Sequence, residues 1–246
     1  GSVPLLGFST IGVADVLAAL EQAQHDPRVR AIILRISSGG GSAQASEALH
    51  AWITHHRKTK PIYLSISGLC ASGCLYLAAA SDRVVAERGA LIGSIGIFAG
   101  KLEGSTLLDL IGVGLEEFGD DLHGRSPFAL TRPFSDDEEH ALRAALQGHY
   151  DLFVAHLRAR GTIPTLDEIA DGRVFESAEA AGLGLLDEIS GFVPLLEKLE
   201  GEAGESLGLW FPEPPSLLER LARLRQFVRV LSDWHVFYLG QHLEAP

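Results

Sequence analysis

The sequence predicts an α/β fold in layers, with a mainly parallel β-sheet surrounded by helices. Three short apolar segments, 30–37, 61–67 and 83–86, have the length and the flanking residues of buried strands. Segments with helical periodicity alternate with them, and a glycine-containing turn follows each of the first two strands. Alternation of buried strands with helices is typical of parallel sheets that are covered by helices.

In the amino-terminal part of the chain, each expected element has a local signal. Apolar residues recur with helical spacing over 11–24, which predicts a helix before the first strand. The glycine-rich turn Ser38–Gly41 follows that strand, and a helix is expected to continue from it through Trp52. A run of small residues over 71–80 follows the second strand and predicts another helix.

The carboxyl-terminal part is expected to be more helical. Ser135 and Glu138 have the spacing of a capping box, and the long helix that they begin is expected to end at Gly161. Residues 171–189 then predict a strand, a helix and a second strand, and a further helix is expected over 194–199.

We expect two domains, 1–204 and 205–246, because the composition changes after Gly204 and prolines interrupt the chain. In the carboxyl-terminal extension, apolar residues from Leu217 to Leu231 form one helical stripe, and most of the arginines lie off it. A basic amphipathic helix of this kind lies on a membrane surface or packs against its own protein or a partner subunit. Packing is the commoner outcome, and we expect it here.

Composition excludes some classes of function. The net charge is −12 and the sequence pI is about 5.2, which argues against binding to nucleic acid, because phosphates require clustered Lys and Arg. No apolar run is long enough to span a bilayer, and no segment has the pattern of a signal peptide. The chain lacks methionine and begins with Gly1-Ser2, typical of a removed tag, so we expect it to be part of a longer protein.

The sequence predicts neither a metal site nor a cofactor. Cys70 and Cys74, the only cysteines, are four residues apart and make a poor metal site without further ligands. On a helix they would share a face, so we expect two small apolar residues packed beside a helix. The ten histidines show no His-Glu-x-x-His or comparable spacing, and we expect most of them in surface or packing roles.

Ser72 is the candidate nucleophile. It lies between Gly68 and Gly73 in the sequence, after an apolar strand and at the start of an expected helix. The helix dipole and the free N–H groups at such a position favour a developing negative charge. A serine at this position is also a standard N-cap, so this segment alone leaves both interpretations open.

A longer pattern resembles the signal peptide peptidase A family, whose fold is similar to that of Clp-type peptidases and crotonases. The matching residues occur in family order and cover most of 30–189. The stretch from Ala-Ser-Gly to Gly-Ser-Ile-Gly is highly specific. The matching stretches are 30–49 (RAIILRISSGGGSAQASEAL), 61–98 (PIYLSISGLCASGCLYLAAASDRVVAERGALIGSIGIF), 126–128 (SPF) and 172–189 (GRVFESAEAAGLGLLDEI).

The resemblance implies roles for three residues. Ser72 matches the nucleophilic serine of the family, and Gly40 and Gly41 match the paired glycines whose backbone N–H groups help form the oxyanion hole. Gly39 stands where the family usually has proline, which should loosen this loop, and Cys74 stands where it usually has glycine. Neither difference removes a reacting group.

The general base is the main departure from the family pattern. Family members use a Ser–Lys dyad, in which a desolvated lysine takes the serine proton; the position of that lysine in short members corresponds to Gly124 here. Long members carry the lysine in a first half and the serine in a second half, which this chain resembles. We therefore expect Ser72 to require a lysine from a missing amino-terminal half, and the isolated chain to be nearly inactive. His123 and Lys101 are alternative bases.

The resemblance implies a serine endopeptidase that degrades short hydrophobic peptides, such as cleaved signal peptides. It also implies a homo-oligomer at the outer face of the cytoplasmic membrane, anchored by a segment absent here. One alternative is an inactive scaffold member that only holds peptides. Another is a crotonase-like enzyme that acts on acyl-CoA thioesters, over which the Ala-Ser-Gly context favours the peptidase.

Overall fold

The computed structural model describes residues 2–3, 8–9, 11–113, 128–129, 132–161 and 163–212. Contacts divide the chain into two units, Gly1–Gly208 and Leu209–Pro246. The first unit contains all the elements described below. The expected extension over 205–246 stays a prediction, because the stripe from Leu217 to Leu231 lies outside the described residues.

The main sheet is built around strand β4 (Ile62–Ala71), which pairs with three other strands. Strand β3 (Ile32–Ser38) runs parallel to β4 along one side, with a register shift near its carboxyl end. On the other side, β5 (Arg83–Ala86) pairs with the first half of β4, and β6 (Leu91–Gly93) pairs with its last three residues. Both are parallel to β4. Because β4 ends at Ala71, Ser72 directly follows the central strand of the sheet.

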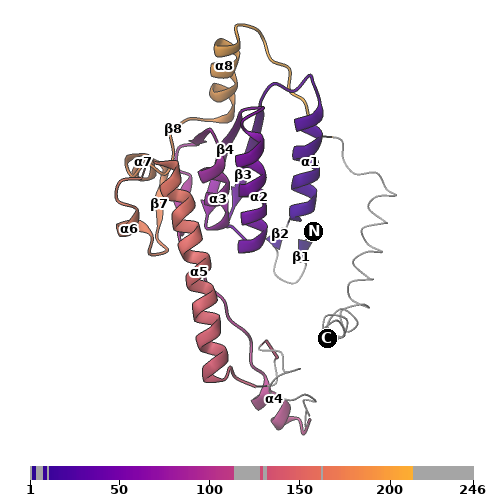
Figure 1. Ribbon diagram of the computed structural model, residues 1–246, viewed down its shortest axis with the longest axis vertical. Helices are drawn as coiled ribbons and strands as arrows, with labels where there is room; N and C mark the ends of the chain where they lie inside the picture. Colours follow the sequence, from indigo (N-terminus) through magenta and orange to yellow (C-terminus); the bar gives the residue numbers. More distant parts are fainter. Residues whose placement is uncertain are drawn as a thin grey trace, which may run out of the picture. The chain divides into compact units, whose positions relative to one another are not determined.

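Two short strands complete this sheet of six strands. β8 (Glu188–Ile189) is parallel to β5, and β7 (Val174–Glu176) is antiparallel to β6. A separate antiparallel pair is formed by β1 (Ser2–Val3) and β2 (Phe8–Ser9). The predicted α/β fold with a mainly parallel sheet and surrounding helices is confirmed (Figure 1).

A row of helices leads from α1 (Val13–His25) through α2 (Ala43–His56) and α3 (Gly73–Ala80) to the long helix α5 (Asp136–Arg160). Each of these helices contacts the next (Figure 1). All of α3 is buried, which agrees with its composition of small and apolar residues. Since α3 begins directly after the central strand and lies between α2 and α5, both helices border the segment around the candidate nucleophile.

Helix α8 (Phe192–Ala203) packs on the face of the sheet that carries Val85. Its residues Leu195 and Leu199 form a buried cluster with Val85. The opposite face has fully buried apolar side chains, as expected for a sheet covered by helices on both sides. The cluster on the α8 side also includes the partly buried residues Ile33, Tyr63 and Leu207.

The long helix confirms the predicted cap. The Ser135 side chain accepts a hydrogen bond from the Glu138 N–H, and the Glu138 carboxylate accepts one from the Ser135 N–H. Gly161 ends the helix with a φ of 78°. No helix among the described residues is long and apolar enough to cross a membrane. Three short helices complete the described structure: α4 (Ser105–Leu110), α6 (Leu166–Ile169) and α7 (Ser177–Gly182).

Candidate active site

Ser72 occupies a sharp turn between the central strand and helix α3. Its φ is 51° and its ψ is −117°, a conformation that is strained for a residue with a side chain. The Ser72 side chain makes no capping hydrogen bond, so the structure does not support the N-cap interpretation. A serine in a strained turn from a strand into a helix is the geometry of a nucleophile elbow, which presents the hydroxyl group for reaction.

Neighbouring main-chain groups hold this turn in place. The Ser72 N–H donates to the Gly93 carbonyl at 2.9 Å, and the Leu75 N–H donates to the Ser72 carbonyl at 2.8 Å. Gly93 is itself confined, because a Cβ at this position would lie 2.4 Å from the carbonyl oxygen of Arg173. Strand β6, confined by the residues at the start of β7, therefore holds the Ser72 turn in position.

The glycine-rich loop after β3 presses directly against the Ser72 turn. Gly40 has a φ of +94°, and a Cβ there would lie 2.7 Å from the Gly73 nitrogen and 2.8 Å from both the Ala71 oxygen and the Ser72 Cβ. Only glycine combines this conformation with so close an approach. The Gly40 N–H donates to Ser38 Oγ at 3.1 Å, so in this structure it is already engaged.

Two other N–H groups beside the serine are available. The Gly41 nitrogen lies 3.3 Å from the point where a Gly73 Cβ would stand. Within the described ranges, neither the Gly41 N–H nor the Gly73 N–H has a hydrogen-bond acceptor. Gly73 was not predicted from the sequence; the signal was its place directly after the serine, where a nucleophile elbow supplies an N–H donor.

Cys70 and Cys74 form a disulfide across the Ser72 turn, which corrects the prediction that they are two separate packed residues. Both cysteines are buried, as expected. The spacing of four residues indicates only that the two would share a face if they lay on a helix. Cys70 instead belongs to the strand and Cys74 to the helix, and the turn brings their Cα atoms to 5.2 Å, within the range that a disulfide requires.

Lys101 does not approach Ser72. Its Nζ lies 4.2 Å from the centroid of the Phe134 ring, beside the start of α5. Helix α3 meets α5 much farther along, where the rings of Tyr76 and Phe153 stack at 4.4 Å. The part of α5 between its first residue and Phe153 is about 25 Å long at 1.5 Å per residue.

The other three lysines also lie away from the serine. Lys60 Nζ donates to main-chain carbonyls at the end of α1, and Lys198 pairs with a glutamate on β8. Lys58 is exposed after the carboxyl end of α2, whereas the glycine loop precedes the amino end of that helix. Because His123 and Gly124 lie outside the described residues, the source of the base stays a prediction.

Comparison with known proteins decides the family. A family model described as peptidase family S49 matches residues 54–205, more than half of the chain. This chain belongs to peptidase family S49. The predicted membership of the signal peptide peptidase A group is thereby confirmed, and the serine elbow described above lies inside the matched S49 region.

Several S49 relatives are similar over about three quarters of this chain. Protease 4 of Salmonella typhi is 31% identical over 74% of the chain, and the chloroplastic serine protease SPPA of Arabidopsis thaliana is 30% identical over 74%. A putative signal peptide peptidase SppA of Enterococcus faecium is 28% identical over 76%. The matched part spans only 30%, 27% and 55% of these three relatives, respectively.

A second group of polar side chains joins α2 to α5. His156 Nε2 lies 2.7 Å from Glu47 Oε2, and the rings of His156 and His50 stack with their centroids 3.6 Å apart. Burial, and then the charge of His156, lower the pKa of His50 to about 4. This cluster was not predicted from the sequence, because His156 is distant in the chain from the other two residues.

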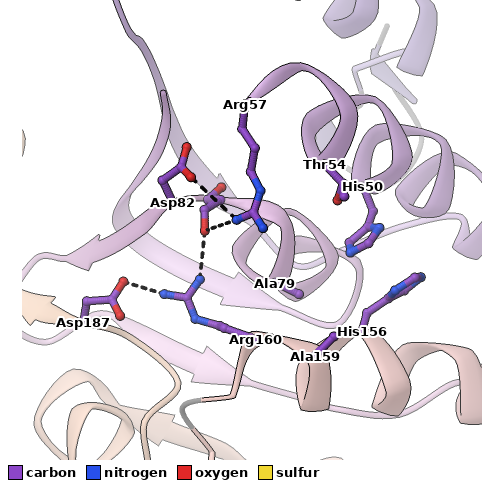
Figure 2. A pocket seen from close by; sticks show the side chains of 10 residues that line it. His50, Thr54, Arg57, Ala79, Asp82, His156, Ala159, Arg160 and Asp187 are labelled. Carbon is purple, nitrogen blue, oxygen red and sulfur yellow. Dashed lines mark hydrogen bonds and ion pairs between the residues drawn. The ribbon is translucent and has the colours of Figure 1, made fainter. Parts of the chain in front are cut away.

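His50 and His156 line a cavity of about 240 Å³ between α2, α3 and α5 (Figure 2). At its other end, Arg57 pairs with Asp82 and Arg160 pairs with Asp187. Ser72 is not among the lining residues, so this cavity is separate from the candidate nucleophile.

Proposed function

We propose that this chain carries the nucleophile of a serine peptidase. The observation that supports this most is the strained turn at Ser72, with the N–H groups of Gly41 and Gly73 beside it. Backbone strain at one residue persists only where the surrounding structure holds that residue in place. Such strained residues are typical of active sites.

In the proposed reaction, Ser72 Oγ attacks the carbonyl carbon of a peptide bond and its proton passes to a general base. The developing oxyanion accepts hydrogen bonds from Gly41 and Gly73, each worth about 3 kcal/mol of transition-state stabilisation. Gly40, the other donor implied by the family resemblance, would contribute after its N–H leaves Ser38 Oγ. The amine leaves with a proton from the base, and water then hydrolyses the acyl-enzyme.

We propose that the base is a lysine supplied by an amino-terminal half of the same protein. The positions of Lys58, Lys60, Lys101 and Lys198, the only lysines of the sequence, support an external source. A desolvated lysine has a lowered pKa and can take the proton of a serine hydroxyl. The isolated chain should therefore be nearly inactive.

The substrate class, assembly and location remain proposals that rest on the family resemblance. We propose short hydrophobic peptides, such as cleaved signal peptides, as substrates. We also propose a homo-oligomer at the extracytoplasmic face of the cytoplasmic membrane, held there by a segment outside this sequence.

Labelling with a fluorophosphonate tests the assignment of Ser72 and of the base. The chain is produced with and without its native upstream region, and Ser72→Ala serves as the control in each form. Labelling that appears only in the longer form and disappears in Ser72→Ala is the expected result. Labelling of the short chain would place the base within it, and His123 would be replaced next.

The alternative function is an inactive member that holds peptides without cleaving them. The absence of a lysine beside Ser72 among the described residues favours it. No labelling of either form, together with binding of a short hydrophobic peptide in a fluorescence-anisotropy titration, would support this alternative over the peptidase.

A further inference from the structure

The cluster formed by Glu47, His50 and His156 brings three potential metal ligands together from two helices. One ligand atom from each residue lies within 4.8 Å of the other two. Glu47 and His50 are three residues apart on α2, which places them on one face of that helix, and His156 reaches them from α5. The contact between His156 and Glu47 at 2.7 Å already orients two of the three groups.

His50 is the least expected member of this cluster. Its residue is only 9% exposed, and neither ring nitrogen has a hydrogen-bond partner among the residues that the structure describes. The ring nitrogens are not among the fully buried atoms without a partner in the described residues, so they keep some solvent contact and can be reached by a ligand. The His50 ring lines the cavity and lies against the His156 ring (Figure 2), so a ligand at the edges of the two rings could bind a nitrogen of each.

We propose that Glu47, His50 and His156 bind a divalent transition-metal ion of the zinc class. Imidazole nitrogen and carboxylate oxygen are suitable ligands for zinc, and three protein ligands with an open fourth position is a common arrangement. The cavity beside the histidines has room for a water molecule at that fourth position. The metal site is separate from Ser72 and does not depend on the proposed peptidase function.

Small side-chain movements would complete the coordination. Bonds of about 2.0–2.1 Å at tetrahedral angles require ligand atoms about 3.3 Å apart, so the ligand atoms must contract from their present separation of up to 4.8 Å. The side chains of His156 and Glu47 are 18% and 36% exposed and are free to adjust on the surface side of the buried His50. The two rings must also rotate out of their stacked arrangement to direct one nitrogen each at the metal.

Zinc titration of the untagged full chain, first stripped with a chelator, tests the site. We expect one equivalent of Zn²⁺ to bind in isothermal titration calorimetry with a Kd of about 1 μM or tighter. Co²⁺ should give the visible absorption bands of tetrahedral coordination. Glu47→Gln and His156→Gln, which preserve size and polarity, should each weaken Zn²⁺ binding about 100-fold.

The matched controls are His55→Gln on α2 and His140→Gln on α5, two exposed histidines outside the cluster. Both should bind Zn²⁺ as the unaltered chain does. Circular dichroism checks that every variant is folded. The proposal is overturned if the unaltered chain binds Zn²⁺ no better than His156→Gln, or if the controls lose binding to the same extent as the cluster variants.

Discussion

The Ser72 turn and the Glu47–His50–His156 cluster both border helix α2, but they are built from different parts of the chain. Main-chain groups set the geometry of the serine, since an added Cβ at Gly40 would clash with the backbone of Ala71 and Gly73. Side chains from two helices make up the cluster. The first region should therefore be sensitive to an added carbon atom at Gly40, and the second to the loss of particular polar groups.

The largest effect is expected from Gly40→Ala. The new Cβ would combine a φ of +94° with main-chain contacts of 2.7 to 2.8 Å, which should cost about 3 kcal/mol of stability and displace the serine. We expect fluorophosphonate labelling of Ser72, measured in the protein with its upstream region, to slow by about 100-fold or more.

Gly41→Ala is the matched control, because a Cβ there would meet nothing within 4 Å. It keeps the N–H that we assign to the oxyanion, and its stability should change by no more than about 1 kcal/mol. Equal labelling rates in the two variants would contradict a turn whose geometry is set by the close approach of Gly40.

The disulfide is expected to have the next largest effect. Closing the loop of five residues that runs from Cys70 to Cys74 contributes about 2 kcal/mol in the chain-entropy model. Urea unfolding with a reductant present should therefore show a stability lower by about this amount than unfolding without it. Cys70→Ser/Cys74→Ser is the control and should be insensitive to reductant. An unaltered chain that is equally stable under both conditions would mean that its thiols are not paired.

Relief of strain at the nucleophile should have a smaller, stabilising effect. A glycine at position 72 adopts a φ of 51° without a steric penalty from a side chain, whereas an alanine there keeps the penalty. We expect Ser72→Gly to be more stable than Ser72→Ala by about 1 kcal/mol in urea unfolding, although neither carries a nucleophile. The reverse order would show that the turn is not strained at this residue.

Sequence patterns predicted the parts of the fold that local periodicity determines. The capping box at Ser135, the buried strand before Ser72 and the long helix to Gly161 were all recognisable from a few neighbouring residues. Strand β6 was missed because its three residues are too short to show a pattern and are defined by pairing with β4 and β7.

The candidate site was also only partly predictable, because much of its geometry depends on contacts between segments that are distant in the sequence. The resemblance pointed to Ser72 and to the glycine pair, but the positive φ of the serine and the donor at Gly73 depend on how three segments meet. The disulfide depends on the turn between Cys70 and Cys74. The histidine cluster joins residues on separate helices, a relation that no local spacing reveals.

A further contrast is that features built from side chains respond to pH, whereas the glycine contacts at Ser72 do not. The capping box of α5, the helix that carries His156, offers the clearest case. The Arg132 guanidinium and the Ser135 N–H lower the pKa of the Glu138 carboxyl to about 2, below its usual 4.5. The carboxylate therefore stabilises the fold above about pH 4.5, and this contribution is lost as the pH falls toward 2.

Glu138→Gln removes this titration while keeping a side chain that can accept the Ser135 N–H bond. We expect the variant to have the lower Tm near neutral pH and the difference to shrink as the pH falls through the window from about 4.5 to about 2. The effect should be small, because the pair is near the surface and salt screens it. A difference in Tm that stays constant over this range would show that the carboxylate charge contributes nothing to the cap.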